Sequence, residues 1–254
     1  MSLKPKLLPK IILASSFALV ELGFFFPKLT YFTMAIGCIA MVLVAYAMVP
    51  KVEDEEKWYY YAIFPFFLFF SYYGYSLLLT NKFSVQALYV GGSLFLYYYF
   101  GSIYYYIYKP SLYRAFSIEN ISSYGNLLSF FFFASLLYGL QSFIDAPVWI
   151  LMAALLAFSV LIVIQVVWAN KISIKKGKAH IFAVCLALIE IAWSISYLPL
   201  KYNVAGMSLA IFYYMIVGLL RFNLLNKLDA KAVGTYLGFG FLSLSVLLLT
   251  AHWF

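Results

Sequence analysis

The chain of 254 residues is 66% hydrophobic and 22% aromatic, and only 10% of its residues are charged. A soluble domain has about a quarter of its residues charged, so this composition excludes a soluble globular protein and indicates a helical bundle surrounded by lipid. The net charge of +8 is carried mainly by the connections between apolar runs, where it bears on membrane orientation. We expect no nucleic-acid partner.

Nine apolar segments are long enough to span a bilayer, which takes roughly 17–25 residues. They cover residues 10–26, 30–49, 58–80, 85–108, 124–143, 147–169, 179–200, 204–225 and 232–253. Most prolines mark segment ends, whereas Pro65 lies inside the third segment and predicts a kink or a later helix start there. We therefore predict an all-α, polytopic transmembrane bundle of nine helices that forms one integral membrane domain over residues 1–254.

The basic residues set the predicted orientation. With the N-terminus in the cytoplasm, 14 of the 17 Lys and Arg residues fall on the inner side, and only Lys28, Lys82 and Lys201 fall outside. Cytoplasmic loops carry an excess of Lys and Arg, so this distribution supports both the helix count and the orientation. We predict a cytoplasmic N-terminus, an external C-terminus and a location in a bacterial or archaeal plasma membrane.

The third and fourth segments contain an excess of aromatic residues, as in FPFFLFFSYYGY (64–75) and LFLYYYFGSIYYYIY (94–108). Two explanations stay open. One combines a general compositional bias with a belt of tyrosines at the headgroup level. The other is a pocket for a lipophilic ligand, such as a quinone or polyene, beside these two helices. Tyr97–Tyr99 lie deeper than a belt and require hydrogen-bond partners for their hydroxyls.

Motifs for catalysis, metal binding and cofactor binding are absent from the sequence. His180 and His252 are predicted at opposite membrane faces, and Cys38 and Cys185 lie in separate apolar segments. There is no HExxH, GxSxG, phosphate-binding loop or dinucleotide fingerprint. We expect no catalytic residue, metal or cofactor, and we favour a non-enzymatic protein over an enzyme.

Two acidic residues, Glu190 and Glu21, lie within predicted spans. At about 1.5 Å per residue, Glu190 is about 15 Å from His180 and about 13 Å from Pro199, which places it at the midplane. Glu21 is nearer the outer surface. A charged group at the bilayer centre costs about 3 kcal/mol, so we expect both carboxyl groups to face the bundle interior.

Small residues extend the predicted inward face of both helices. Each glutamate has alanines three and seven positions before it, and alanine permits close packing of helices; these are Ala14, Ala18, Ala183 and Ala187. On the seventh helix the same face continues through Trp193, Ser194 and Tyr197, and we expect Gln165 of the sixth helix as a polar neighbour. The opposite face, with Leu188 and Ile195, is expected to meet lipid or apolar neighbours.

These residues support two interpretations. In one, Glu190 and Glu21 exchange protons or bind cations in a small transporter, with Ser194, Tyr197, Trp193 and Gln165 nearby. In the other, each glutamate hydrogen-bonds a partner helix and the protein is a non-enzymatic membrane component that packs with partner proteins or lipids. We favour the second as the function, with the transporter as the alternative and a lipid-modifying intramembrane enzyme as the third hypothesis.

One pattern near the C-terminus resembles a known group. Glu190, Trp193, Tyr197-Leu198-Pro199 and a helix ending in Gly218-Leu219-Leu220-Arg221 are similar to the C-terminal part of an uncharacterised group of bacterial multi-pass membrane proteins. That group has no established activity. The resemblance covers about a fifth of the chain and implies a membrane location without a mechanism.

Overall fold

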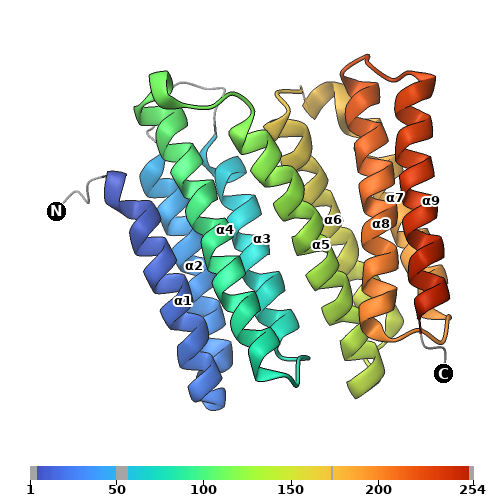
Figure 1. The fold of residues 1–254 in the computed structure, drawn as a ribbon, viewed down its shortest axis with the longest axis horizontal. Coiled ribbons are helices and arrows are strands. Elements are labelled where there is room, and N and C mark those ends of the chain that lie inside the picture. Colours follow the sequence, from blue (N-terminus) through green and yellow to red (C-terminus); the bar gives the residue numbers. More distant parts are fainter. Residues whose placement is uncertain (1–4, 50–56, 173, 252–254) are drawn as a thin grey trace. The chain divides into compact units, whose positions relative to one another are not determined.

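The computed structural model describes residues 5–49, 57–172 and 174–251 (Figure 1). Within these ranges the chain forms nine α-helices and no strand. They are α1 (Leu8–Phe25), α2 (Thr30–Met48), α3 (Trp58–Ser76), α4 (Lys82–Tyr108), α5 (Ser117–Ile144), α6 (Val148–Ala169), α7 (Ile174–Ser196), α8 (Tyr202–Leu224) and α9 (Ala230–Thr250). The prediction of an all-helical membrane bundle is confirmed.

Seven of these helices are long and apolar enough to cross a membrane, among the residues that the structure describes. The two others, α3 and α4, have 19 and 27 residues. Their many tyrosines lower the mean hydropathy, although about 28 Å of helix, the length of α3, matches the hydrocarbon core. The predicted membrane orientation stays a prediction, and some of its lysines, such as Lys4 and Lys51, lie outside the described residues.

Helix boundaries agree with the predicted segments to within a few residues, with three exceptions. First, α5 begins at Ser117, before the predicted start of its segment. Second, α3 runs from Trp58 through Pro65, so a later start at this proline was wrong. Third, α7 ends at Ser196 and not at residue 200, because Leu198 and Leu200 already form the turn into α8.

The chain divides into two compact units, residues 1–126 and 127–254, and the boundary lies within α5. Unit 1 contains α1–α4 and the first turns of α5, whereas unit 2 contains the rest of α5 and α6–α9. The single membrane domain over residues 1–254 stays a prediction.

In unit 1 the aromatic helix α3 forms the core. Helix α3 packs on α2 and α4, and α1 also packs on both. Twelve of the 19 residues of α3 are buried. Glycines on the neighbouring helices leave room for its rings: Tyr73 at Gly23, Phe69 at Gly37, Tyr72 at Gly92 and Phe64 at Gly125. A methyl group at any of these glycines would collide with the ring, so α3 is held by interlocked aromatic rings and glycines.

Unit 2 is organised around α5 and α8. The ring of Phe130 on α5 stacks on Tyr213 of α8 with centroids 4.3 Å apart, and Phe133 stacks on Phe158 of α6 at 4.1 Å. Helix α7 lies between α6 and α8. Helix α9 packs mainly on α8, and only Gly240 and Leu244 of α9 are buried. Most of the surface of α9 is therefore exposed in this unit.

Candidate functional site

Glu190 lies on the exposed face of α7, which differs from the predicted inward position. Trp193 and Tyr197 on the same face are 53% and 71% exposed. The indole nitrogen of Trp193 donates a hydrogen bond to the hydroxyl of Tyr197 at 2.7 Å. The Ser194 hydroxyl, also exposed, donates to the backbone carbonyl of Glu190 at 2.9 Å. These four residues form one polar and aromatic surface, which we call the Glu190 face.

The depth of Glu190 also differs from the prediction. Because α7 ends at Ser196, the glutamate lies about 9 Å from that end of the helix. Its distance from Gly177, where the apolar part of α7 begins, is about 20 Å. The carboxyl group is thus inside the apolar span but nearer to the α7–α8 end than to the middle.

The buried side of α7 is the one predicted to meet lipid or apolar neighbours. Leu188 and Ala192 are fully buried and Ile195 is 6% exposed. The hydroxyl of Tyr138 on α5 donates a hydrogen bond to the carbonyl of Ala192 at 2.9 Å. A small side chain at Ala192 leaves this carbonyl accessible to the tyrosine. Ala192 is therefore the alanine of α7 that is buried against the tyrosine of α5.

The four alanines predicted at packing positions are not buried. Ala14, Ala18 and Ala183 are exposed and Ala187 is half-buried. On α1 the buried stripe instead contains Ile12, Ser16, Val20 and Gly23. The reason is the same in both helices, because the packed side is the one that meets an aromatic residue of another helix. Tyr73 of α3 lies against Gly23 of α1, and Tyr138 of α5 donates a hydrogen bond to the carbonyl of Ala192 on α7.

Gln165 is fully buried on α6 but is not a neighbour of Glu190 along the bundle. Helices α6 and α7 run antiparallel and are joined near residue 172. Counted from this connection, Glu190 is about 11 residues farther away than Gln165, or about 16 Å along the helix axis. The structure therefore brings together Glu190, Trp193, Ser194 and Tyr197, while Gln165 lies near the other end of α7.

Glu21 belongs to unit 1 and is half-buried, with a buried Oε1 atom that has no hydrogen-bond partner. It lies within electrostatic range of Tyr89 on α4. The Tyr89 hydroxyl is 3.1 Å from that of Ser76 on α3. A second pair, Thr33 on α2 and Tyr73 on α3, joins its hydroxyls at 2.6 Å. These groups form a buried polar cluster at the ends of α1 and α3 and the starts of α2 and α4.

The sequence interpretation missed this cluster and the hydroxyl pairing inside it. A signal was present: Tyr73 and Ser76, like Thr30 and Thr33, are three residues apart and so lie on one helical face. The expected need for partners in Tyr97–Tyr99 is met in part, because the Tyr99 hydroxyl donates to the carbonyl of Tyr61 at 3.1 Å. Tyr98 is 60% exposed.

The rings proposed to line a ligand pocket on α3 are largely core residues. Phe64, Phe69, Tyr72 and Tyr73 are fully buried against neighbouring helices and their glycines. These four rings are thus occupied by packing within the protein. The lipophilic ligand beside α3 and α4 stays a prediction.

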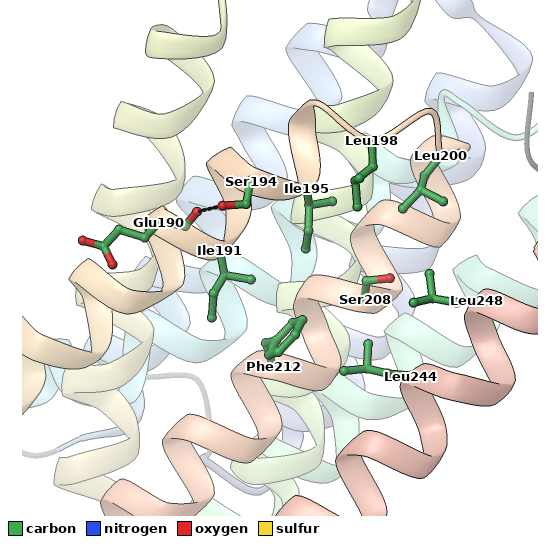
Figure 2. A pocket seen from close by; sticks show the side chains of 10 residues that line it. All are labelled: Glu190, Ile191, Ser194, Ile195, Leu198, Leu200, Ser208, Phe212, Leu244 and Leu248. Atoms are coloured by element: carbon green, nitrogen blue, oxygen red, sulfur yellow. Dashed lines mark hydrogen bonds between the residues drawn. The ribbon is translucent and has the colours of Figure 1, made fainter.

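A groove of about 590 Å³ lies between α7, α8 and α9 in unit 2, as Figure 2 shows. Its lining is mostly apolar and consists of Glu190, Ile191, Ser194, Ile195, Leu198, Leu200, Ser208, Phe212, Leu244 and Leu248. In the figure the carboxylate of Glu190 points away from Phe212 and Leu244. Glu190 and Ser194 therefore belong both to the Glu190 face and to the lining of the groove.

Within the described residues, no three His, Cys, Asp or Glu side chains come together in a way that would hold a metal ion. Cys38 and Cys185 are free thiols, both buried. Comparisons of the chain with protein-family models, with curated proteins and with solved structures give no match. The resemblance of the C-terminal pattern to a bacterial membrane-protein group stays a prediction.

Proposed function

We propose that this multi-pass membrane protein is a non-enzymatic component that assembles with another membrane protein through the Glu190 face of α7. One observation carries the proposal: an acidic side chain about 9 Å inside an apolar helix is exposed in its unit. Facing lipid, such a group costs up to about 3 kcal/mol, less as it nears the interface. A hydrogen-bonding or basic side chain from a partner helix offsets this cost.

The rest of the face suits a protein partner. Trp193 and Tyr197 expose large rings, and aromatic residues are enriched among the residues that contribute most to protein interfaces. Since the Tyr197 hydroxyl accepts from Trp193, its own proton is available for donation to a partner. A belt at the headgroup level accounts for the two rings, but it does not account for Glu190.

The test is co-purification in mild detergent from membranes of the source cell. Glu190→Leu is expected to weaken the complex by about tenfold, because a hydrogen bond to a charged group contributes about 1.5–3 kcal/mol. Glu190→Gln, which keeps an acceptor and adds donors, is expected to retain part of the complex. Phe182→Leu is the control, since Phe182 is 71% exposed on the same side of α7 but lies two turns away.

Two outcomes would count against the proposal. One is a Glu190→Leu protein that accumulates normally and migrates with the same companions as the wild type. The other is equal loss of the complex in Phe182→Leu, which indicates that any change on the α7 surface has this effect.

The alternative is a small proton- or cation-coupled transporter, and one observation favours it. The buried Oε1 atom of Glu21 has no hydrogen-bond partner, so it is available to a proton, a cation or a water molecule. In that case Glu21→Gln abolishes proton-driven uptake in proteoliposomes at unchanged protein abundance. Glu190→Gln is the comparison, since a transport path through unit 1 does not require Glu190.

A further inference from the structure

We infer that the groove between α7, α8 and α9 holds one acyl chain of an anionic phospholipid. Its floor and walls are mostly apolar, with Ile191, Ile195, Phe212, Leu244 and Leu248 as the main surfaces, and its polar lining residues are Glu190, Ser194 and Ser208. A volume of about 590 Å³ lies within the range of small-ligand sites, which is roughly 300–1,000 Å³. A helix, about 10–12 Å across, is too wide for this volume over the two turns of α7 that line the groove.

A polar group inside the groove supports a lipid with an ester carbonyl. The Ser208 side chain is only 3% exposed, and its hydroxyl has no hydrogen-bond partner. In Figure 2 this hydroxyl points from α8 toward Leu248 on α9, across the groove. A buried hydroxyl without a partner is unfavourable in an apolar environment, and a carbonyl oxygen of the ligand would accept its proton.

A basic residue that follows the groove lining in the chain supports an anionic headgroup. Lys201 is exposed and directly follows Leu200, which lines the groove at the α7–α8 end. From Lys201 to Ser208 is about 10 Å along α8. A phospholipid presents its phosphate, its ester carbonyls and its chain in this order. The cation, the hydroxyl and the apolar lining therefore match one lipid that enters from the leaflet on the α7–α8 side.

The experiment uses the full-length protein in vesicles with a trace of phosphatidylglycerol that carries a photoreactive diazirine in one acyl chain. After illumination, labelled residues are identified by mass spectrometry. We expect labelling at half-buried Phe212 to exceed labelling at Phe241, which is 59% exposed on α9. Exposure to bulk lipid alone predicts the reverse order.

Substitutions on α9 and at Lys201 separate specific binding from general lipid contact. Leu244→Trp fills the groove and is expected to reduce labelling of Phe212 to the level at Phe241. Leu242→Trp, at a 64% exposed position of the same helix, is the control and leaves it unchanged. Lys201→Gln is expected to reduce the preference for phosphatidylglycerol over phosphatidylcholine by about fivefold, the contribution of one lysine near an anionic surface.

Leu248→Trp serves as a second groove-filling substitution if Leu244→Trp does not accumulate. The inference is overturned if Phe212 is labelled less than Phe241, or if neither groove-filling variant lowers its labelling. None of these results depends on a partner for Glu190, because labelling is measured at Phe212 and the Glu190 carboxylate points away from Phe212 and Leu244.

Discussion

The two units bury their polar groups in different ways. In unit 1, Thr33 pairs with Tyr73 and Ser76 pairs with Tyr89 inside the bundle. In unit 2, Glu190 is exposed on α7, and the Ser208 hydroxyl lines a groove without a partner. Buried side-chain atoms without a hydrogen-bond partner occur in both units, for example Glu21 Oε1 and the Ser71 hydroxyl in unit 1 and the Ser208 hydroxyl in unit 2. The difference lies in the two acids within apolar helices, because Glu21 of unit 1 is half-buried and Glu190 of unit 2 is exposed in its unit.

The two units also differ in packing. Aromatic rings of α3 occupy the space beside glycines of α1, α2 and α4 and of the first part of α5. The interior of unit 1 is therefore filled, which we call a closed centre. In unit 2, α9 is attached along one side and buries only Gly240 and Leu244. Ring-against-glycine packing therefore fills the interior of unit 1, whereas the outermost helix of unit 2 is attached along one side only.

The largest effect is expected at Gly92 of α4. A side chain there would meet the ring of Tyr72, whereas the adjacent Gly91 faces open space. Gly92→Leu is expected to lower the free energy of unfolding by about 1–3 kcal/mol, the cost of overpacking a filled core. Gly91→Leu is expected to leave it unchanged or raise it by up to about 1 kcal/mol through helix propensity. Titration with SDS in mixed micelles measures both, and equal effects would contradict a closed centre in unit 1.

A smaller loss is expected at Gly240 of α9. A side chain there would meet Met215 of α8, a flexible residue that can move aside. Gly240→Val is therefore expected to cost about 1 kcal/mol of unfolding free energy, while Gly238→Val, which meets nothing, is the control. Protease sensitivity of the α8–α9 connection gives a second measure. A larger loss than for Gly92→Leu would remove the contrast between the units.

The hydroxyl pair in unit 1 is expected to contribute still less. A double-mutant cycle of Tyr73→Phe and Thr33→Val should give a coupling energy of about 0.6 kcal/mol, and at most about 1.7 kcal/mol, as for other hydrogen bonds between membrane helices. Tyr98→Phe, at a 60% exposed position of α4, is the neutral control. Strict additivity of the two changes would mean that the 2.6 Å contact contributes no stability.

The smallest effect is expected for Ser208→Ala in lipid-free detergent. Because the hydroxyl has no protein partner, its removal should change the unfolding free energy by less than about 0.5 kcal/mol. In vesicles of phosphatidylglycerol the same variant should lose part of the stabilisation that lipid gives the wild type. A clear destabilisation already in detergent would show that the hydroxyl is bonded within the protein.

The sequence predicted the helices because their boundaries depend on local features. Apolar length, segment-end prolines and alternating loop charge identified all nine, and the tyrosine-rich α3 and α4 were recognised despite their lower hydropathy. The packed face of α7 was predicted incorrectly because alanines occur on both sides of the helix. The choice between them depends on Tyr138, which is 54 residues from Ala192 in the chain. The Thr33–Tyr73 pair likewise joins residues 40 positions apart.

The most direct test of the central claim is photo-cross-linking from the Glu190 face in native membranes. Benzoylphenylalanine at position 193 is expected to produce a species heavier than the chain, and the amount of this species should fall strongly in the Glu190→Leu background. The same probe at position 241 of α9 should yield lipid adducts only, since Phe241 is exposed outside the groove. If position 193 also yields lipid adducts alone, the Glu190 face meets lipid and the proposed assembly is contradicted.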